Sequence, residues 1–340
     1  MANVDIETPS DFLAAHPNFP ALLANDVIAA RFRAQEAHAN PAKRAYTALG
    51  QFSLLAAFAT FTAVIFAVTL EPYFFPTPKI APISEDPMFR SVMAIIGASG
   101  VAAQIYLLCG PLKKGWLNAR FQTERLRSIK FQAFAEAARG GDEAVAAFTQ
   151  RALSDFDVEL SDSNAARHSF DPAAGMAARL SGANLASPHL AELKDAYRRL
   201  RIERQATFAL GRIKAINEER RLPAASSEIS FWGGAAIAYV DAILAFLEIE
   251  AAWLRPTLHF ATLELFVLSA LLFVLERGRA YTHALERYEE YREHMLRLGE
   301  RLERAKTTED FITCVDATES QALRELKSFC REAEKSTYLI

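Results

Sequence analysis

A run of apolar residues from Ala45 to Leu70 constrains this chain more than any other feature. The run reads AYTALGQFSLLAAFATFTAVIFAVTL and contains no Asp, Glu, Lys or Arg. A helix of about 20 apolar residues, rising ~1.5 Å per residue, crosses a hydrocarbon core of ~30 Å. A helix buried in a soluble protein rarely needs so long a run. We therefore predict a transmembrane helix over about 45–70.

Three further apolar runs predict three more spans, over about 91–112, 229–254 and 256–275. The first two spans are joined by a proline-rich stretch that forbids a continuous helix, and Arg255-Pro256 is predicted to form a tight turn between the last two. Proline is also expected to end the charged helices that precede the first and third spans, at Pro41 and at Leu222-Pro223. The predicted fold is all-α: an integral membrane protein with four transmembrane helices in two hairpins and long cytoplasmic helices.

The basic residues predict how the hairpins are oriented. Cytoplasmic flanks of membrane spans carry an excess of Lys and Arg. The two hairpin turns carry only Lys79, Arg90 and Arg255. The outer flanks carry many more, namely Arg31, Arg33, Lys43, Arg44, Lys113, Lys114, Arg120, Arg220, Arg221, Arg277 and Arg279. Both termini are therefore predicted to be cytoplasmic.

The spans and breakers divide the chain into three predicted segments. Residues 1–139 hold an N-terminal helix, the first hairpin and a charged helix that should end at Gly140-Gly141. Residues 140–187, rich in Ser, Asn, Asp, Ala and Gly, are predicted to be a cytoplasmic linker with a short helix. Residues 188–340 hold a charged helix, the second hairpin and C-terminal cytoplasmic helices.

Composition and motifs narrow the function classes. The net charge of -3, with no strongly basic half, gives no reason to expect direct nucleic-acid binding. Cys109, Cys314 and Cys330 lack metal-ligand spacing, so no metal site is predicted. The chain contains no Walker loop, HExxH or GxGxxG motif. We therefore expect no enzyme activity and no cofactor.

Small residues on two spans predict close helix packing. Ala94, Ala98 and Ala102 repeat every four residues in the second span, which lets another helix approach closely. Gly234 and Ala238 form a similar small-residue face on the third span.

The second hairpin differs from the first because it carries acids within its apolar runs. Asp241 lies near the middle of the third span, Glu248 towards its end, and Glu264 within the fourth span. A carboxylate at mid-bilayer costs at least ~2.5 kcal/mol, so it should face protein or water. One interpretation is an acidic pathway for cations or protons. The other is a set of protonated carboxyls that hydrogen-bond neighbouring helices. His259 is interpreted as an interfacial side chain near the turn.

The charged helix after the first hairpin carries a motif. It reads WLNARFQTERLR from Trp116 to Arg127, with Trp116, Arg120, Glu124 and Arg127 in a W-x3-R-x3-E-x2-R pattern. This pattern behind a two-span hairpin, over residues 25 to 135, resembles the SLATT family of SMODS- and SLOG-associated two-transmembrane effector domains. A second copy would place Tyr288, Arg292 and Leu296 at the positions of the Trp, Arg and Glu, and Leu296 breaks the pattern.

The resemblance implies a function and a location. SLATT proteins are bacterial membrane proteins thought to permeabilise membranes in nucleotide-signalled defence systems. The resemblance therefore implies a non-enzymatic, homo-oligomeric effector in the bacterial inner membrane. The implied effector acts on the lipid bilayer in anti-phage defence, and a cytoplasmic sensor or nucleotide-signalling partner protein controls it. The alternative is a membrane-anchored scaffold or sensor that binds a cytoplasmic partner through its charged helices.

Overall fold

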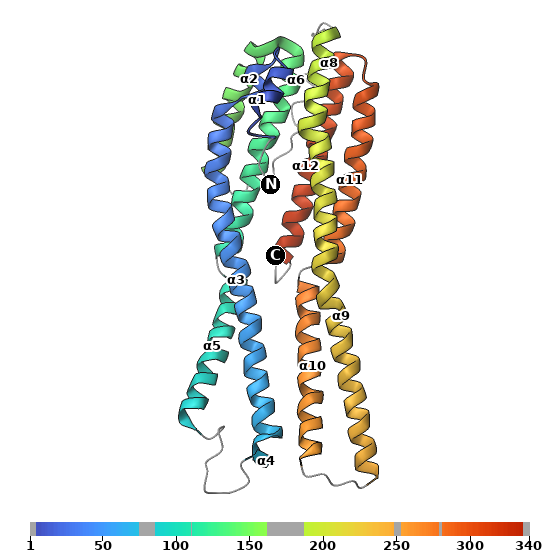
Figure 1. Ribbon diagram of the computed structural model, residues 1–340. Helices are drawn as coiled ribbons and strands as arrows, with labels where there is room; N and C mark the ends of the chain where they lie inside the picture. Colours follow the sequence, from blue (N-terminus) through green and yellow to red (C-terminus); the bar gives the residue numbers. More distant parts are fainter. Residues whose placement is uncertain are drawn as a thin grey trace. The chain divides into compact units, whose positions relative to one another are not determined.

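The computed structural model describes residues 5–74, 86–109, 111–161, 187–247, 253–278 and 281–335. These residues form helices and short connections, with no strand among them, so the predicted all-α fold is confirmed (Figure 1). The helices are α1 (Ser10–Ala15), α2 (Pro20–Leu23), α3 (Asp26–Thr69), α4 (Glu71–Phe74), α5 (Pro87–Cys109), α6 (Pro111–Ser161), α8 (Ser187–Tyr197), η3 (Arg198–Glu203, π-helical), α9 (Arg204–Phe246), α10 (Leu254–Gly278), α11 (Tyr281–Arg304) and α12 (Thr308–Lys335).

Four helical stretches are long and apolar enough to cross a membrane, and each overlaps one of the four predicted spans. Their most apolar 18-residue windows have a mean hydropathy of 1.6 to 2.2, yet only 6% to 19% of each window is buried within the chain. Large apolar side chains such as Leu55, Ile95 and Phe246 are exposed. These helices therefore present apolar surface that the chain itself does not cover.

Three predicted helix boundaries are wrong. Helix α3 continues through Pro41 and α9 continues through Pro223. Proline removes one backbone hydrogen bond, and helices of 44 and 43 residues absorb that loss without ending. Arg255-Pro256 lies inside the first turn of α10 instead of forming the turn between spans, because a proline there displaces no intrahelical hydrogen bond. The described part of the third span ends at Phe246, short of the predicted 254.

The chain divides into two compact units, and neither follows the chain as one continuous segment. Unit 1 comprises Met1–Ala42, Lys114–Ala215 and Thr282–Lys335, and unit 2 comprises Lys43–Lys113, Ile216–Tyr281 and Ser336–Ile340. Each unit thus draws on both the predicted 1–139 and 188–340 segments. Residues 162–186 of the predicted linker lie outside the described residues.

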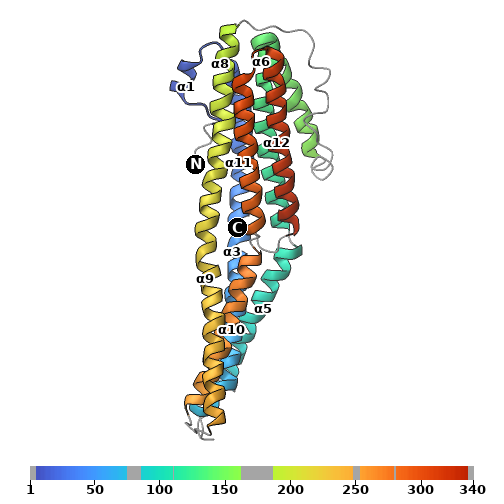
Figure 2. The same ribbon diagram turned by 90° about the vertical axis from the view of Figure 1, so that its right-hand side faces the viewer.

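Unit 1 is a helical bundle with an aromatic core. Helices α11 and α12 run antiparallel beside each other, joined by a short connection (Figure 2). Tyr197 stands at the centre of the core, with ring centroids 5.9 Å from Phe131, 5.3 Å from Phe134 and 6.0 Å from Phe311. All four side chains are fully buried. Helix α6 breaks at Gly140-Gly141, as predicted, where Gly141 adopts a positive φ of 64°.

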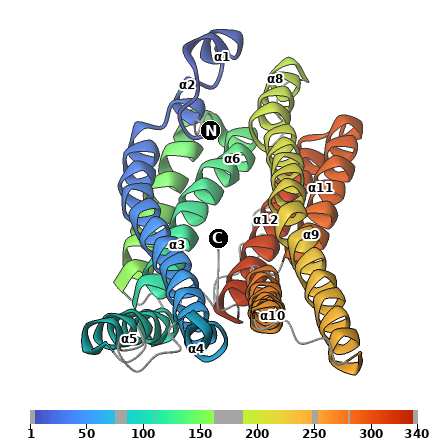
Figure 3. The same ribbon diagram turned by 60° about the horizontal axis from the view of Figure 1, so that its bottom comes forward.

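Unit 2 contains two pairs of apolar helices, α3 with α5 and α9 with α10 (Figure 3). In the first pair, the single Ser53 hydroxyl proton has two acceptors within reach, Gly100 O at 3.3 Å and Gln104 Oε1 at 3.0 Å from Ser53 Oγ. In the second pair, Ser269 Oγ donates to Ser227 O at 2.9 Å. Hydroxyl groups thus join each pair inside apolar surroundings, where backbone carbonyls otherwise lack further partners.

Gly100 allows α5 to lie close against α3. A Cβ atom at Gly100 would lie 2.8 Å from Ala56 Cβ, so only glycine permits this approach. Ala94, Ala98 and Ala102 are exposed on α5. On α9, Gly234 is buried against Leu265 and Phe266 of α10, and Ala238, one turn further on, is half-buried.

Gly100→Val is expected to destabilise the α3–α5 pair. The added side chain must push Ala56 away, and overpacking of this kind costs about 1–3 kcal/mol. Ala59→Val is the matched control because Ala59 is an exposed alanine on α3, the other helix of this pair. Thermal unfolding of the full chain in detergent should show a lower midpoint for Gly100→Val alone. Equal midpoints for the two variants would contradict the close approach at Gly100.

Candidate functional site

Asp241 is held by a histidine from the neighbouring helix of unit 2. Its Oδ2 lies 2.8 Å from His259 Nε2 on α10. The Asp241 side chain is 17% exposed, whereas that of His259 is 58% exposed. Within the described residues, Asp241 Oδ1 is buried and has no hydrogen-bond partner. The described residues therefore leave the hydrogen-bonding capacity of one carboxyl oxygen unsatisfied.

Glu264, like Asp241, has one carboxyl oxygen hydrogen-bonded to another helix and one without a partner among the described residues. Its Oε2 accepts a hydrogen bond from Thr62 Oγ1 on α3 at 3.2 Å. Glu264 Oε1 and the nearby Thr262 Oγ1 are both buried, and the described part of the chain supplies no partner to either atom. Asp241 and Glu264 thus take partners from different helices. Glu248, the third predicted acid, lies outside the described residues.

The chemistry of these groups favours water or a cation as the missing partner. A buried polar oxygen without a hydrogen bond costs free energy, and an unpaired carboxylate costs far more. In an apolar helix such a group is tolerated where it faces protein or a water-filled cavity. Among the described residues, no three His, Cys, Asp or Glu side chains are grouped to hold a metal ion. The unpaired carboxyl oxygens of Asp241 and Glu264 suit contact with water or a cation.

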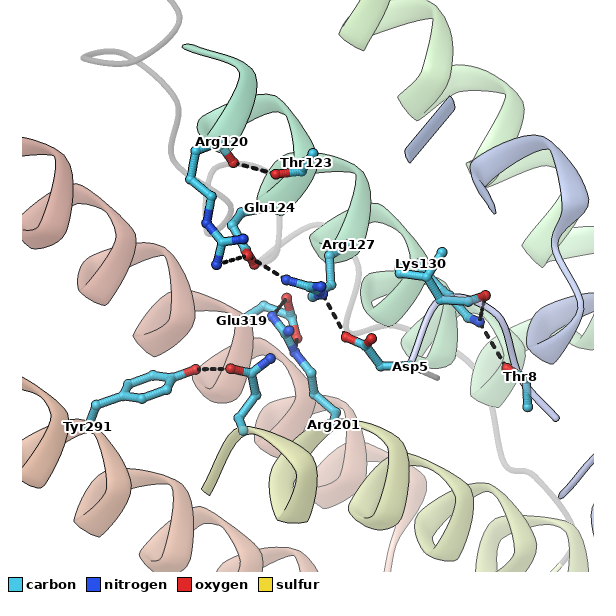
Figure 4. Close-up of polar contacts among 12 residues, drawn as sticks. Asp5, Thr8, Arg120, Thr123, Glu124, Arg127, Lys130, Arg201, Tyr291 and Glu319 are labelled. Atoms are coloured by element: carbon cyan, nitrogen blue, oxygen red, sulfur yellow. Dashed lines mark hydrogen bonds and ion pairs between the residues drawn. The ribbon is translucent and has the colours of Figure 1, made fainter. Parts of the chain in front are cut away.

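The W-x3-R-x3-E-x2-R motif lies on one face of α6 in unit 1. Trp116 is buried, with its ring 5.8 Å from that of Phe329 on α12 in an edge-to-face contact. Arg120 Nη2 lies 2.7 Å from Glu124 Oε1. Arg127 also pairs with Glu124, and its Nε lies 2.6 Å from Asp5 Oδ2 (Figure 4). The motif residues thus join the N-terminal segment and α12 to α6.

The second predicted copy of this motif is placed differently. Tyr288 is buried on α11, where the Arg287 guanidinium lies 5.0 Å from its ring centroid. Leu296, at the position of Glu124, is 44% exposed and supplies no charge. Only the first copy therefore builds a buried ionic cluster.

A second buried ion pair, Arg201 with Glu319, joins η3 to α12. Arg201 Nε and Nη2 donate to the two carboxylate oxygens of Glu319 at 2.7 and 2.8 Å, and both side chains are at most 2% exposed. The Tyr197 hydroxyl donates to the same carboxylate at 3.2 Å. The Arg201 guanidinium also lies 4.7 Å from the Phe131 ring centroid, a cation–π contact with α6. Arg201 lies in the π-helical segment, a distortion often found at functional sites.

Electrostatics keep these pairs ionised. Burial raises the pKa of Glu124, but the attraction of Arg120 and Arg127 outweighs it and lowers the pKa to about 2. Burial opposes the charge on Arg201, and Glu319 more than compensates, so the Arg201 pKa is raised. Burial, together with the Glu319 carboxylate, raises the pKa of the Tyr197 phenol, which therefore stays protonated.

Lys130 fixes the N-terminal segment to α6. Its ammonium group is buried and donates to Ile6 O and Leu23 O, both at 2.9 Å, and to Thr8 Oγ1 at 3.1 Å. Burial lowers the Lys130 pKa to about 8, partly offset by Asp5. With the Asp5–Arg127 pair, these contacts give the segment before α3 a defined position.

No family model, curated protein or solved structure matches the chain. The acids of unit 2 and the buried ion pairs of unit 1 are therefore the features that bear on its function.

Proposed function

We propose that the chain is a multi-pass protein of the bacterial inner membrane, with both termini in the cytoplasm. The uncovered apolar surface of its four candidate spans supports this, because soluble proteins rarely expose large apolar patches. The concentration of Lys and Arg on the outer flanks of the two predicted hairpins supports the orientation.

Its activity, in this proposal, is to permeabilise the membrane as a non-enzymatic effector. The observation that carries the proposal is the pair of acids Asp241 and Glu264, each with one buried oxygen that has no hydrogen-bond partner among the described residues. Within a bilayer, such oxygens need water or a cation. We assign them to the wall of a hydrated path for cations.

Assembly and control complete the proposal. The exposed alanines 94, 98 and 102 offer a second copy of the chain a close approach, so the path forms in a homo-oligomer. The resemblance of residues 25 to 135 to the SLATT family supports a role in anti-phage defence. A cytoplasmic sensor or nucleotide-signalling partner then acts on the helices of unit 1, whose rearrangement opens the path.

Bacterial membrane potential tests this proposal. Induced expression of the wild type should depolarise the cells, as read by a voltage-sensitive dye, and the Asp241→Asn, Glu264→Gln double variant should not. Glu228→Gln is the matched control because Glu228 is an exposed acid near the start of the same predicted span. Equal depolarisation by wild type and the double variant would remove the two acids from the path.

The alternative function is a membrane scaffold that binds a partner through its charged helices. The exposed face of α11 favours it, because Glu293 with Arg297 and Glu300 with Arg304 form charged pairs that are 61% to 81% exposed. Here expression should leave the membrane potential unchanged. Reversing the charges of Glu293 and Glu300 in the full chain should then abolish co-purification of a bacterial partner that the wild type retains.

A further inference from the structure

A small cavity lies inside unit 1, between α6, η3 and α12. Its volume is about 20 Å³. A cavity needs roughly 10–15 Å³ to hold one water molecule. The lining includes Glu124, Ser128, Arg201, Glu319, Ala322 and Leu326. The space thus admits a water-sized ligand and nothing much larger.

Two buried polar groups on its wall lack partners among the described residues. Arg201 uses Nε and Nη2 to bind Glu319, which leaves Nη1 as a buried donor without an acceptor. Ser128 Oγ is also buried without a partner, and the residue is 8% exposed. Leaving such groups unpaired is costly, so buried polar groups are nearly always satisfied by protein or by ordered water.

The charges on the wall select the ligand. The carboxylates of Glu124 and Glu319 repel an anion, and the guanidinium groups of Arg125 and Arg201 repel a cation. A neutral molecule that both donates and accepts suits the mixture. It can accept from Arg201 Nη1, exchange a hydrogen bond with Ser128 Oγ and donate to a carboxylate, which gives the two to four polar partners that a buried water needs.

We propose that this cavity binds one ordered water molecule, which bridges Ser128 on α6 and Arg201 on η3. The water connects the Glu124–Arg127 cluster to the Arg201–Glu319 pair and completes a polar network across unit 1. This site is separate from the acids of unit 2, so it does not depend on the proposed permeabilising activity.

The first test is a density map of the full chain at a resolution that shows waters. A peak within about 2.7–3.2 Å of both Ser128 Oγ and Arg201 Nη1 is expected. Empty density would overturn the proposal. An anomalous peak after bromide exchange would overturn it too, because it would identify an anion.

The second test fills the cavity with protein atoms. Ala322→Val adds two methyl groups to its wall, and Ala317→Val on the same helix is the matched control because Ala317 is also half-buried but is not among the lining residues. Displacing the water should lower the unfolding midpoint of Ala322→Val by at least ~2 °C relative to the control. A midpoint equal to or above the control would overturn the proposal, because filling a dry cavity stabilises.

Discussion

Arg201→Met is expected to lower the free energy of unfolding by about 3–5 kcal/mol, because it leaves the buried Glu319 carboxylate without its bidentate partner. The Tyr197 hydroxyl still donates to Glu319, but one neutral hydrogen bond does not replace a guanidinium. Unfolding of the full chain in detergent, followed by denaturant titration, measures the loss.

Two further variants make this prediction specific. Arg198→Met removes pairs with Asp195, Glu203 and Glu303, whose side chains are 34% to 60% exposed, and should cost about 1 kcal/mol, well below the cost of Arg201→Met. The double variant Arg201→Met, Glu319→Leu should recover most of the stability, since an apolar pair of similar volume replaces a buried ion pair at little cost. A double variant as unstable as Arg201→Met alone would contradict this account of the pair.

The second large effect is a pH dependence that comes from Glu325 on α12. Glu325 Oε1 lies 3.4 Å from Arg287 Nε, and Arg287 also pairs with Glu332, so one guanidinium serves two acids. Burial of the carboxyl is the largest influence on its pKa, the attraction of Arg287 opposes it, and Glu124 adds repulsion. Together they raise the Glu325 pKa from 4.5 to about 7.

The sign of the pH effect follows from the raised pKa. The folded chain retains a proton that the unfolded chain releases, so the contribution is fully present below pH 4.5 and is lost as the pH rises to about 7. At ~1.36 kcal/mol per pKa unit, the loss is about 3 kcal/mol. Glu325→Gln should abolish this part of the pH dependence and should exceed the wild type in stability above pH 7.

The pH window separates Glu325 from its neighbour Glu124. Because Glu124 has a lowered pKa of about 2, its stabilising contribution changes only below pH 4.5. The difference in stability between wild type and Glu325→Gln should therefore grow between pH 5 and 7 in thermal unfolding. A constant difference across this range would show that Glu325 is ionised throughout.

The apolar helices could be predicted from the sequence because their signal is local. A run such as 45–70 needs no knowledge of the rest of the fold, and α3 contains it almost entirely. Boundaries depended on rules for proline, and these failed where the helices on both sides of Pro41 and Pro223 were long. Local composition therefore predicts that the apolar helices exist, but it does not predict the residues at which these long helices begin and end.

The partner of Asp241 could not be predicted because it depends on where the connection between α9 and α10 lies, which local composition does not determine. A turn at Arg255 would place Glu248 and Glu264 at the same level of the two antiparallel helices. Because α9 ends at Phe246 and α10 begins at Leu254, Asp241 and His259 lie at the same level instead. A shift of a few residues in the connection thus changes every pairing between two antiparallel helices. The pairing of Glu264 with Thr62 could not be predicted from local patterns either, because it joins residues 202 positions apart in the chain.

The buried ion pairs of unit 1 could hardly be predicted from the sequence. Arg201 follows the apolar stripe of Leu193, Tyr197 and Leu200, where an arginine is easily assigned to the solvated face. The π-helical segment from 198 to 203 shifts the register of the helix by an amount that no local propensity reports. Glu319 and Asp5, the acids that neutralise the core arginines, are distant in sequence from Arg201 and Arg127.

Cation flux through liposomes that contain the purified chain tests the central claim most directly. The wild type should release trapped K⁺ faster than it passes Cl⁻. The double variant Asp241→Asn, Glu264→Gln should reduce K⁺ release at least ~10-fold. This is the loss expected when the path loses charged groups that stabilise a cation by about 1.4 kcal/mol or more. Equal K⁺ release by wild type and the double variant would contradict a cation path lined by these acids.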